Sequence, residues 1–194
     1  MKDKVILTDC DGVLLDWSYG FAQWMGRHGY EADDRYARDY AFMNRYGISK
    51  EESRRLVRMF NESATIRKLS PLKDAIKYVR KLHEEHGYVF HVITSMTNDQ
   101  YAQHLRTKNL IEVFGPTVFE KYVYLDCGAD KDEALMKYAD TGCWWIEDKV
   151  ENANCGWGFG LNPLLMGHDH NRGFKDVDIP RVESWKEIYD IITK

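Results

Sequence analysis

Short apolar segments alternate along this chain with segments of helical periodicity, and this alternation limits the folds that the chain can adopt. Helix-like stretches lie between most of the strand-like segments. The strand-like segments are residues 4–9, 88–94, 122–126, 143–147 and 161–166. The alternation predicts an α/β fold with a parallel sheet and helices on both faces, in which ligands bind beyond the carboxyl ends of the strands.

One long segment interrupts the alternation. Residues 15–68 contain no convincing strand pattern and are rich in aromatic residues, which predicts several helices around a small core of their own. After it, residues 72–82 place their apolar side chains on one helical stripe, with Ser70 as the expected N-cap and Pro71 at the first helical position. The sequence therefore predicts a core of residues 1–14 and 69–194 and an inserted helical subdomain of residues 15–68.

The charge of the chain excludes a dedicated nucleic-acid binder. Its 27 Lys and Arg residues oppose 31 Asp and Glu residues, so the formal net charge is −4, and the positive field that attracts a duplex is missing. The sequence has no run of about 18 apolar residues, and its first residues lead into a strand-like segment rather than a signal peptide. We expect a cytoplasmic protein that binds a small molecule, and neither a membrane nor duplex nucleic acid.

The cysteines show no metal-site spacing. They lie far apart, at Cys10, Cys127, Cys143 and Cys155, without a Cys-x-x-Cys pair. Because free cysteine is among the most buried residue types, we expect four small buried side chains.

Acidic residues follow two of the predicted strands. Asp9 and Asp11 leave the first strand together, and Gly12 frees the backbone to turn. Glu147 and Asp148 follow the fourth strand. Clustered carboxylates repel each other unless a cation or a proton lies between them, and Mg²⁺ is bound by one or two carboxylates with other oxygens. The two pairs therefore predict a magnesium site.

The ends of the second and third strands carry groups suited to an anion. Thr94 and Ser95 end the second strand, just before a helix that Thr97 or Asn98 could cap, and free N–H groups at a helix start bind phosphate. After the third strand, Lys131 follows Asp130, the expected N-cap, and so falls in a first helical turn. A positive charge in the first turn is unfavourable because it opposes the helix dipole. Two interpretations remain: Lys131 is an ordinary surface lysine, or its side chain points toward the carboxylates.

These four features, in this order, resemble the four motifs of the haloacid dehalogenase-like (HAD) superfamily. That resemblance implies a Rossmann-like core with an inserted helical cap of the C1 type, and the second acid of the first motif implies the phosphotransferase branch. Within the superfamily, the chain is similar to the 5'(3')-deoxyribonucleotidases. The similar segments are Asp11-Gly12-Val13-Leu14-Leu15-Asp16-Trp17 and Ile146-Glu147-Asp148-Lys149, in which Glu147 replaces an Asp.

The resemblance also implies roles for the motif residues. Asp9 would be the nucleophile that forms an aspartyl-phosphate, and Asp11 would be the general acid and base. The carboxylates of Asp9 and Asp148 and the backbone carbonyl of Asp11 would hold Mg²⁺, while Glu147 would orient ligands. Thr94, Ser95 and Lys131 would bind the phosphoryl oxygens and balance their charge.

Two segments are candidates for further substrate contacts. Three aromatic residues follow the first motif at the entrance to the cap: Trp17, Tyr19 and Phe21. One of them, with Trp17 as the first candidate, stacks on a nucleobase, or the rings pack in the cap core. His168–Arg172 has a metal-like composition but lacks a third ligand for zinc, so we interpret it as a loop beside the active site, with Arg172 as a phosphate or acid partner.

Together these features predict a Mg²⁺-dependent phosphomonoesterase that hydrolyses nucleoside (deoxy)monophosphates. The alternative within the same fold is a phosphatase for sugar phosphates or polynucleotide 3'-phosphate ends. A phospho-accepting receiver domain also uses Asp, Ser/Thr and Lys around Mg²⁺, but it lacks the insertion and its acceptor Asp ends the third strand. A binding module without activity is the last option, although every motif position holds a competent residue. The sequence leaves open the base and sugar preference, 5' against 3' phosphate, and the oligomeric state, a homodimer included.

Overall fold

The computed structural model describes residues 4–36 and 42–194. A six-stranded sheet in the order β3-β2-β1-β4-β5-β6 forms its centre, and every neighbouring pair is parallel. This is the strand order of a doubly wound Rossmann fold. The strands are β1 (Val5–Thr8), β2 (Val89–Ser95), β3 (Phe119–Leu125), β4 (Trp144–Glu147), β5 (Asn162–Met166) and β6 (Arg181–Val182). The predicted α/β class and parallel sheet are confirmed, whereas the two-residue β6 was not predicted.

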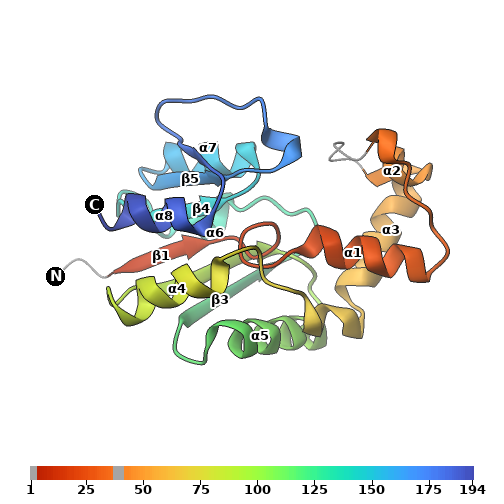
Figure 1. Cartoon of the computed structure of the whole chain (residues 1–194), viewed down its shortest axis with the longest axis horizontal. Helices are drawn as coiled ribbons and strands as arrows, with labels where there is room; N and C mark the ends of the chain where they lie inside the picture. The colour runs from red at the N-terminus through yellow and green to blue at the C-terminus, as the bar shows by residue number, and fades with distance from the viewer. Residues whose placement is uncertain (1–3, 37–41) are drawn as a thin grey trace.

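The strands β1, β2, β4 and β5 are mostly buried because helices cover the sheet on each side (Figure 1), whereas the edge strand β3 is only partly buried. On one face, α4 (Ala75–Glu84), α5 (Gln100–Phe114) and α8 (Trp185–Ile192) pack against inward-facing residues such as Ile6 and Val92. On the other face, α6 (Asp132–Met136) and α7 (Val150–Gly158) cover Leu7 and Ile93. Adjacent strand residues thus enter different cores, which explains why these strands read as continuous apolar runs.

The segment between β1 and α4 is helical. It contains α1 (Trp17–Arg27), α2 (Phe42–Tyr46) and α3 (Lys50–Asn61), with short 3₁₀ turns at Asp34–Tyr36 and Ala64–Lys68. In Figure 1 these helices lie beyond the carboxyl ends of the strands, at the side of the molecule away from both termini. Trp17, Phe21, Trp24 and Phe60 are buried and pack against one another, so aromatic rings build a core here, as expected.

The division into a core and a cap stays a proposal. It rests on the placement of these helices and on the absence of a strand between Asp16 and Lys68 among the described residues. Residues 1–3 of the predicted core and 37–41 of the predicted cap lie outside the described residues. In the described part of the chain, no helix is long and apolar enough to cross a membrane.

The start of α4 differs from the prediction. The helix begins at Ala75 rather than after Ser70, and its N-cap is Asp74, which has a left-handed φ of 61° and no side-chain bond to its own helix. The carboxylate of Asp74 instead accepts hydrogen bonds from the backbone N–H groups of Trp185 and Lys186, at 3.2 Å each. A residue 111 positions away thus determines the conformation at this helix start, and the local pattern around Pro71 does not contain that information.

The cysteine prediction is only partly correct. Cys10 is buried, but Cys127, Cys143 and Cys155 are half-buried, and all four are free thiols. The three half-buried residues lie in the loop after β3, just before β4 and on α7, where side chains reach the edge of the core rather than its centre.

Candidate active site

The loop after β1 brings the first acidic pair to the carboxyl edge of the sheet. The Asp9 N–H extends the β1–β4 ladder by donating to the Ile146 carbonyl at 2.8 Å, and Asp9 Oδ1 accepts from the Cys10 N–H at 2.7 Å. Asp9 is only 7% exposed. These backbone contacts fix the direction of the Asp9 carboxylate, which lines a cavity of about 420 Å³.

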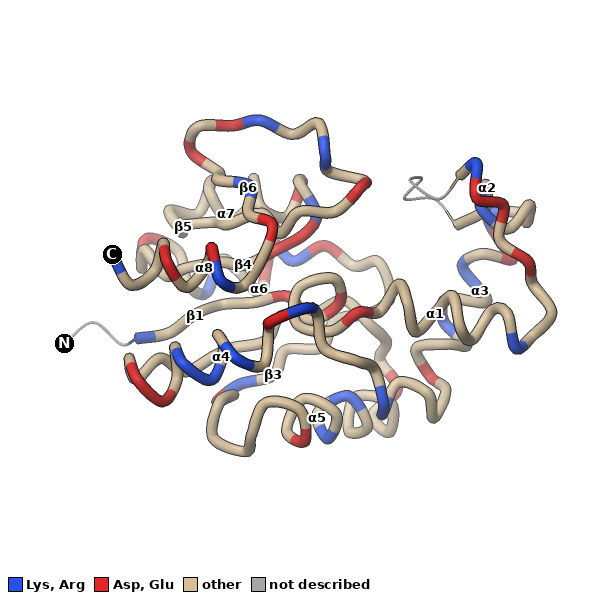
Figure 2. Tube along the Cα trace, viewed as in Figure 1, with Lys and Arg blue, Asp and Glu red and all other residues tan. Residues whose placement is uncertain are grey.

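Gly12 is required where it stands. Its φ is +78°, a conformation that side chains rarely adopt, and a Cβ atom would lie 2.9 Å from Cγ of Asp148 and closer still to its carboxylate oxygen. The glycine therefore allows the acid after β4 to approach the loop after β1. Figure 2 shows acidic positions in red on the trace beyond β1.

Lys131 joins the two acidic pairs. Its Nζ lies 2.8 Å from Asp9 Oδ2 and 2.7 Å from Glu147 Oε2, and its side chain is 2% exposed. Burial alone would lower the pKa of Lys131, but the two carboxylates together raise it. The lysine is thus directed at the carboxylates, and the alternative of a surface lysine is wrong.

The position of Lys131 in its helix also differs from the prediction. Lys131 is itself the N-cap of α6, without a side-chain capping bond, and Asp130 is exposed. A cap residue lies outside the first turn, so the lysine side chain is free to turn away from its helix toward the sheet edge, where it contacts the carboxylates.

Glu147 is fully occupied by hydrogen bonds. Its Oε1 accepts from the N–H groups of Asp148 and Lys149 at 2.9 and 3.0 Å, and its Oε2 accepts from Lys131 and from the Asn152 amide at 3.2 Å. A carboxylate offers about four lone-pair sites, so Glu147 has none left for a metal ion. This agrees with the orienting role that the resemblance implies.

Burial perturbs every acid of the cluster. Burial raises the pKa of Asp9 to about 6, although the nearby Lys131 opposes the shift. Burial, followed by the charge of Asp9, raises the pKa of Asp148 to about 7. Burial also raises the pKa values of Asp11 and Glu147. Burial therefore disfavours the ionised form of all four acids.

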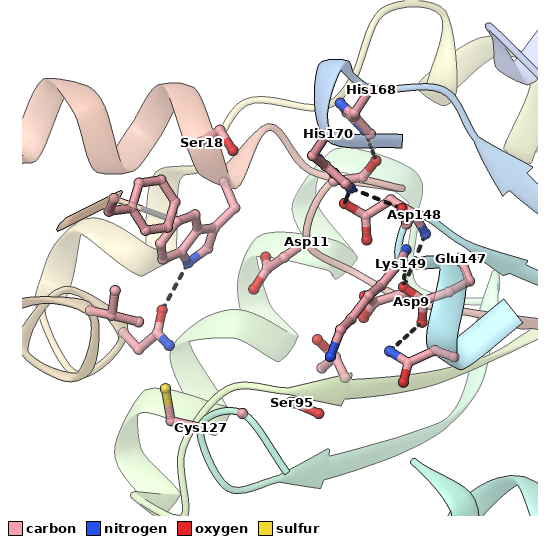
Figure 3. A pocket seen from close by; sticks show the side chains of 18 of the residues that line it. Asp9, Asp11, Ser18, Ser95, Cys127, Glu147, Asp148, Lys149, His168 and His170 are labelled. Atoms are coloured by element: carbon pink, nitrogen blue, oxygen red, sulfur yellow. Dashed lines mark hydrogen bonds and ion pairs between the residues drawn. The ribbon is translucent and has the colours of Figure 1, made fainter. Parts of the chain in front are cut away.

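The arrangement fits a divalent cation. Carboxylate oxygens of Asp9, Glu147 and Asp148 lie within 4.8 Å of one another (Figure 3). Because Glu147 is saturated, Asp9 and Asp148 remain as side-chain ligands, and hard cations such as Mg²⁺ prefer oxygen ligands and need only one or two carboxylates. Asp11 is absent from this side-chain group, which is compatible with a contact through its backbone carbonyl.

The predicted phosphate-binding residues lie at the same cavity. Thr94 is 1% exposed and lines the cavity together with Ser95 and Lys131. The Ser95 hydroxyl donates to the Ala129 carbonyl at 2.7 Å, so its side chain already has an acceptor. The following helix does not begin as predicted: its N-cap is Asp99, which accepts from the Ala102 N–H at 2.7 Å, and not Thr97 or Asn98.

The helical segment forms the opposite wall of the cavity. Its lining residues include Trp17, Ser18, Phe42 and Asn61. Trp17 is stacked on Phe21 and donates its indole N–H to Asn61 Oδ1 at 2.8 Å, and the Asn61 amide donates to the Met96 carbonyl at 3.0 Å. Trp17 thus lines the cavity and also packs in the core of the helical segment, while its stacking on a nucleobase stays a prediction.

The loop at His168–Arg172 borders the cavity, as expected, but Arg172 does not reach it. His168 and His170 line the cavity and contact the backbone carbonyls of Gly12 and Asp148, at 2.6 and 2.9 Å. Arg172 has a 62% exposed side chain and pairs with Asp169 at 2.5 Å. Arg172 is not among the residues that line the cavity, although its partner Asp169 is, so the position of Arg172 does not support its predicted contact with the substrate.

The sequence reasoning missed one buried cation. Arg106 on α5 is fully buried and forms an ion pair with Asp11. The available signal was its position among Ala102, Leu105 and Leu110 on the buried stripe of that helix, where a charged residue needs a partner.

Comparisons with known proteins agree with this geometry. A family model described as "5' nucleotidase, deoxy (Pyrimidine), cytosolic type C protein" matches residues 3–194. An uncharacterized 32.4 kDa protein of Enterobacteria phage T4, from the Gp30-rIII intergenic region, is 28% identical over 137 residues, which cover 68% of this chain and 48% of the phage protein. The chain thus spans about half the length of this curated relative.

Several solved structures share the fold. The haloacid dehalogenase-like hydrolase SP0104 from Streptococcus pneumoniae has a TM-score of 0.67 at 18% identity, with 98% of this chain and 99% of the other covered. The magnesium-bound putative HAD-hydrolase YfnB from Bacillus subtilis has a TM-score of 0.66 at 14% identity, with both chains fully covered. CbbY from Rhodobacter sphaeroides, in complex with phosphate, has a TM-score of 0.62 at 15% identity and 96% coverage of each chain.

Proposed function

The chain belongs to the family of cytosolic type C 5'-nucleotidases (deoxy, pyrimidine) and has the HAD fold, and from this premise we propose that it is a Mg²⁺-dependent phosphomonoesterase that hydrolyses nucleoside (deoxy)monophosphates. The observation that carries the proposal is the position of Asp9. Its carboxylate lies at the cavity, paired with Lys131 and within 4.8 Å of the Asp148 carboxylate.

In the proposed reaction, Asp9 attacks the phosphorus atom and forms an aspartyl-phosphate while the ester oxygen leaves. Asp11 donates a proton to that oxygen, and the raised pKa of Asp11 favours the protonated form that this step needs. Asp11 then takes a proton from the water that hydrolyses the intermediate, which returns the Asp9 carboxylate and releases phosphate.

The remaining residues bind and orient the phosphoryl group. Thr94, the backbone N–H of Ser95 and the Lys131 ammonium are suited to bind the phosphoryl oxygens and to balance the charge that grows in the transition state. Asp9 and Asp148, with the Asp11 carbonyl, would hold Mg²⁺. When bound, the ion supplies the positive charge that lets an anionic carboxylate meet an anionic ester.

The size and walls of the cavity support a nucleotide as substrate. Its volume of about 420 Å³ falls in the range of small-molecule sites, and an aromatic wall with Trp17 and Phe42 faces the acidic cluster. Such a wall can bind the flat face of a base while the phosphate meets Lys131.

A substrate panel tests this proposal. Hydrolysis of nucleoside 5'- and 3'-monophosphates, sugar phosphates and a 3'-phosphorylated oligonucleotide is measured with and without Mg²⁺. We expect Mg²⁺-dependent release of phosphate with a preference for nucleoside monophosphates. Equal rates on sugar phosphates or on oligonucleotide ends would contradict the proposed substrate class.

Two Asp→Asn variants test the proposed roles. Asp9→Asn is expected to abolish turnover, whereas Asp178→Asn, at an exposed aspartate, should match the wild type. Asp11→Asn should lower turnover by about 10²- to 10⁴-fold and leave Mg²⁺ binding in a calorimetric titration largely intact. Activity that survives in Asp9→Asn, or lost Mg²⁺ affinity in Asp11→Asn, would contradict these assignments.

A further inference from the structure

Arg106 forms an unusual buried contact beneath the cavity. The residue is fully buried on α5, and its Nη1 contacts Asp11 Oδ1 and lies 3.0 Å from Cys10 Sγ. Its Nε and Nη2 atoms are buried and have no hydrogen-bond partner among the described residues. The guanidinium therefore makes one strong ion pair while most of its donors stay unpaired.

This arrangement is poorly explained by packing. A buried polar group without a partner costs stability, and a buried ion pair is no better for stability than well-packed apolar side chains of similar volume. The neighbouring stripe positions on α5 hold Ala102, Leu105 and Leu110, so an apolar residue would continue the pattern at position 106. The cost of the arginine points to a function of the carboxylate that it binds.

Asp11 is placed to reach the leaving group. It lines the cavity, and its side chain is 20% exposed. In Figure 3, Asp11 lies apart from Asp9 and Asp148, toward the side of the cavity where Ser18 of the helical segment lies. Arg106 occupies Oδ1, whereas Oδ2 has no hydrogen bond to a described residue. One oxygen is thus fixed and the other is available.

We propose that Arg106 is a positioning residue: its guanidinium binds Oδ1 of Asp11 and holds the carboxyl group so that Oδ2 carries out the proton transfers of the reaction. This inference rests on the proposed phosphatase function. As the P–O bond breaks, the proton on Oδ2 moves to the ester oxygen. As water then bonds to phosphorus and the Asp9 carboxylate leaves, the water proton moves to Oδ2.

The ion pair with Arg106 fixes the Asp11 carboxyl group at the edge of the cavity. A fixed carboxyl group avoids the loss of rate that misplacement of a catalytic group causes.

The test combines Arg106→Met with Asp11→Asn in a double-mutant cycle on a pyrimidine deoxynucleoside 5'-monophosphate with Mg²⁺. We expect Arg106→Met to lower kcat by about 10- to 100-fold, within the range of acid–base catalysis, and to change KM by less than about twofold. In the Asp11→Asn background, the same change should alter kcat by less than about twofold, because no acid remains to be positioned.

A second substrate isolates the protonation step. p-Nitrophenyl phosphate has a leaving group that departs without a proton, so the first equivalent of nitrophenolate should appear at nearly the wild-type rate in Arg106→Met. Later turnovers should be slow, because Asp11 must still activate water. Lys108→Met, on the exposed side of α5, is the matched control and should behave as the wild type in both assays.

The outcomes distinguish a failure of the proposed phosphatase function from a failure of the proposed role of Arg106. A wild-type protein that hydrolyses none of the esters would overturn the proposed function and the role of Arg106 with it. An active wild type with an equal loss of kcat in both backgrounds, or a change in KM alone, would overturn only the role of Arg106. Urea unfolding checks that each variant is folded. If Arg106→Met is not, Arg106→Lys replaces it in the cycle, and a loss of kcat that depends on Asp11 is again required.

Discussion

The buried acids should make the metal-free protein less stable as the pH rises. Asp9 and Asp148 have pKa values of about 6 and about 7 in the folded protein, against 3.8 for an exposed Asp, chiefly because of burial. Between pH 4 and 7, the folded protein therefore holds protons that the unfolded chain has released. The free energy of unfolding must fall with pH across this window, since stability rises with pH only where the unfolded state binds more protons.

The magnitude follows from the two shifts. One pKa unit corresponds to about 1.4 kcal/mol, so Asp9 accounts for about 3 kcal/mol and Asp148 for about 4 kcal/mol. The contributions are not additive, because the charge of Asp9 is itself one cause of the shift at Asp148. We expect a combined loss of about 4 to 6 kcal/mol between pH 4 and 8.

Urea unfolding in the presence of a chelator, followed by tryptophan fluorescence, measures the free energy of unfolding at each pH. The variant Asp148→Asn separates the contribution of Asp148 from those of other titrating groups. The variant removes the charge but nearly keeps the shape of the side chain. It should be more stable than the metal-free wild type by about 2 to 4 kcal/mol at pH 8, with the difference vanishing near pH 4.

Mg²⁺ should remove most of the stability difference between the two proteins at pH 8. At 100 times its Kd, the ion would stabilise the wild type by about 2.7 kcal/mol and leave Asp148→Asn nearly unchanged. The reasoning is refuted if the metal-free wild type is as stable at pH 8 as at pH 4 when both are measured relative to Asp148→Asn.

Two pairs of glycine substitutions test the packing of the site and of the fold. Gly12→Ala should abolish Mg²⁺ binding in calorimetry because its methyl group would displace Asp148, whereas Gly29→Ala, with a similar positive φ of 82° but open space around it, should bind Mg²⁺ normally. In Gly156→Ala the added methyl group would clash with the buried indole ring of Trp145, which should lower the free energy of unfolding by about 1 to 3 kcal/mol. The control Gly158→Ala, in the same helix with open space around it, should not lower the free energy of unfolding. A Gly12→Ala protein that binds Mg²⁺ as the wild type does, or a Gly156→Ala protein of unchanged stability, would contradict the stated contacts.

The sheet could be predicted because its central strands are buried on both faces. Such strands appear in the sequence as continuous apolar runs, and the acids that follow Thr8 and Ile146 mark where these runs end. Parallel strands bring their carboxyl ends to one edge, so Asp9 and Asp148 could be expected near each other before any coordinates were known. The two-residue β6 carries no comparable pattern.

Contacts between distant residues account for what could not be predicted. Asp74 starts α4 in a left-handed conformation because its carboxylate caps α8. Arg106 reaches Asp11 across 95 positions of sequence. In each case the conformation of a side chain depends on a partner that only folding brings close to it.

Chemical trapping of the acyl-phosphate tests the central claim most directly. The wild-type protein is mixed with a deoxynucleoside 5'-monophosphate and Mg²⁺, quenched during the first turnover and reduced with borohydride, and its peptides are identified by mass spectrometry. We predict that residue 9 is converted from aspartate to homoserine, only with substrate and Mg²⁺ present. Turnover that leaves Asp9 unmodified, or modification of another carboxylate, would contradict the account.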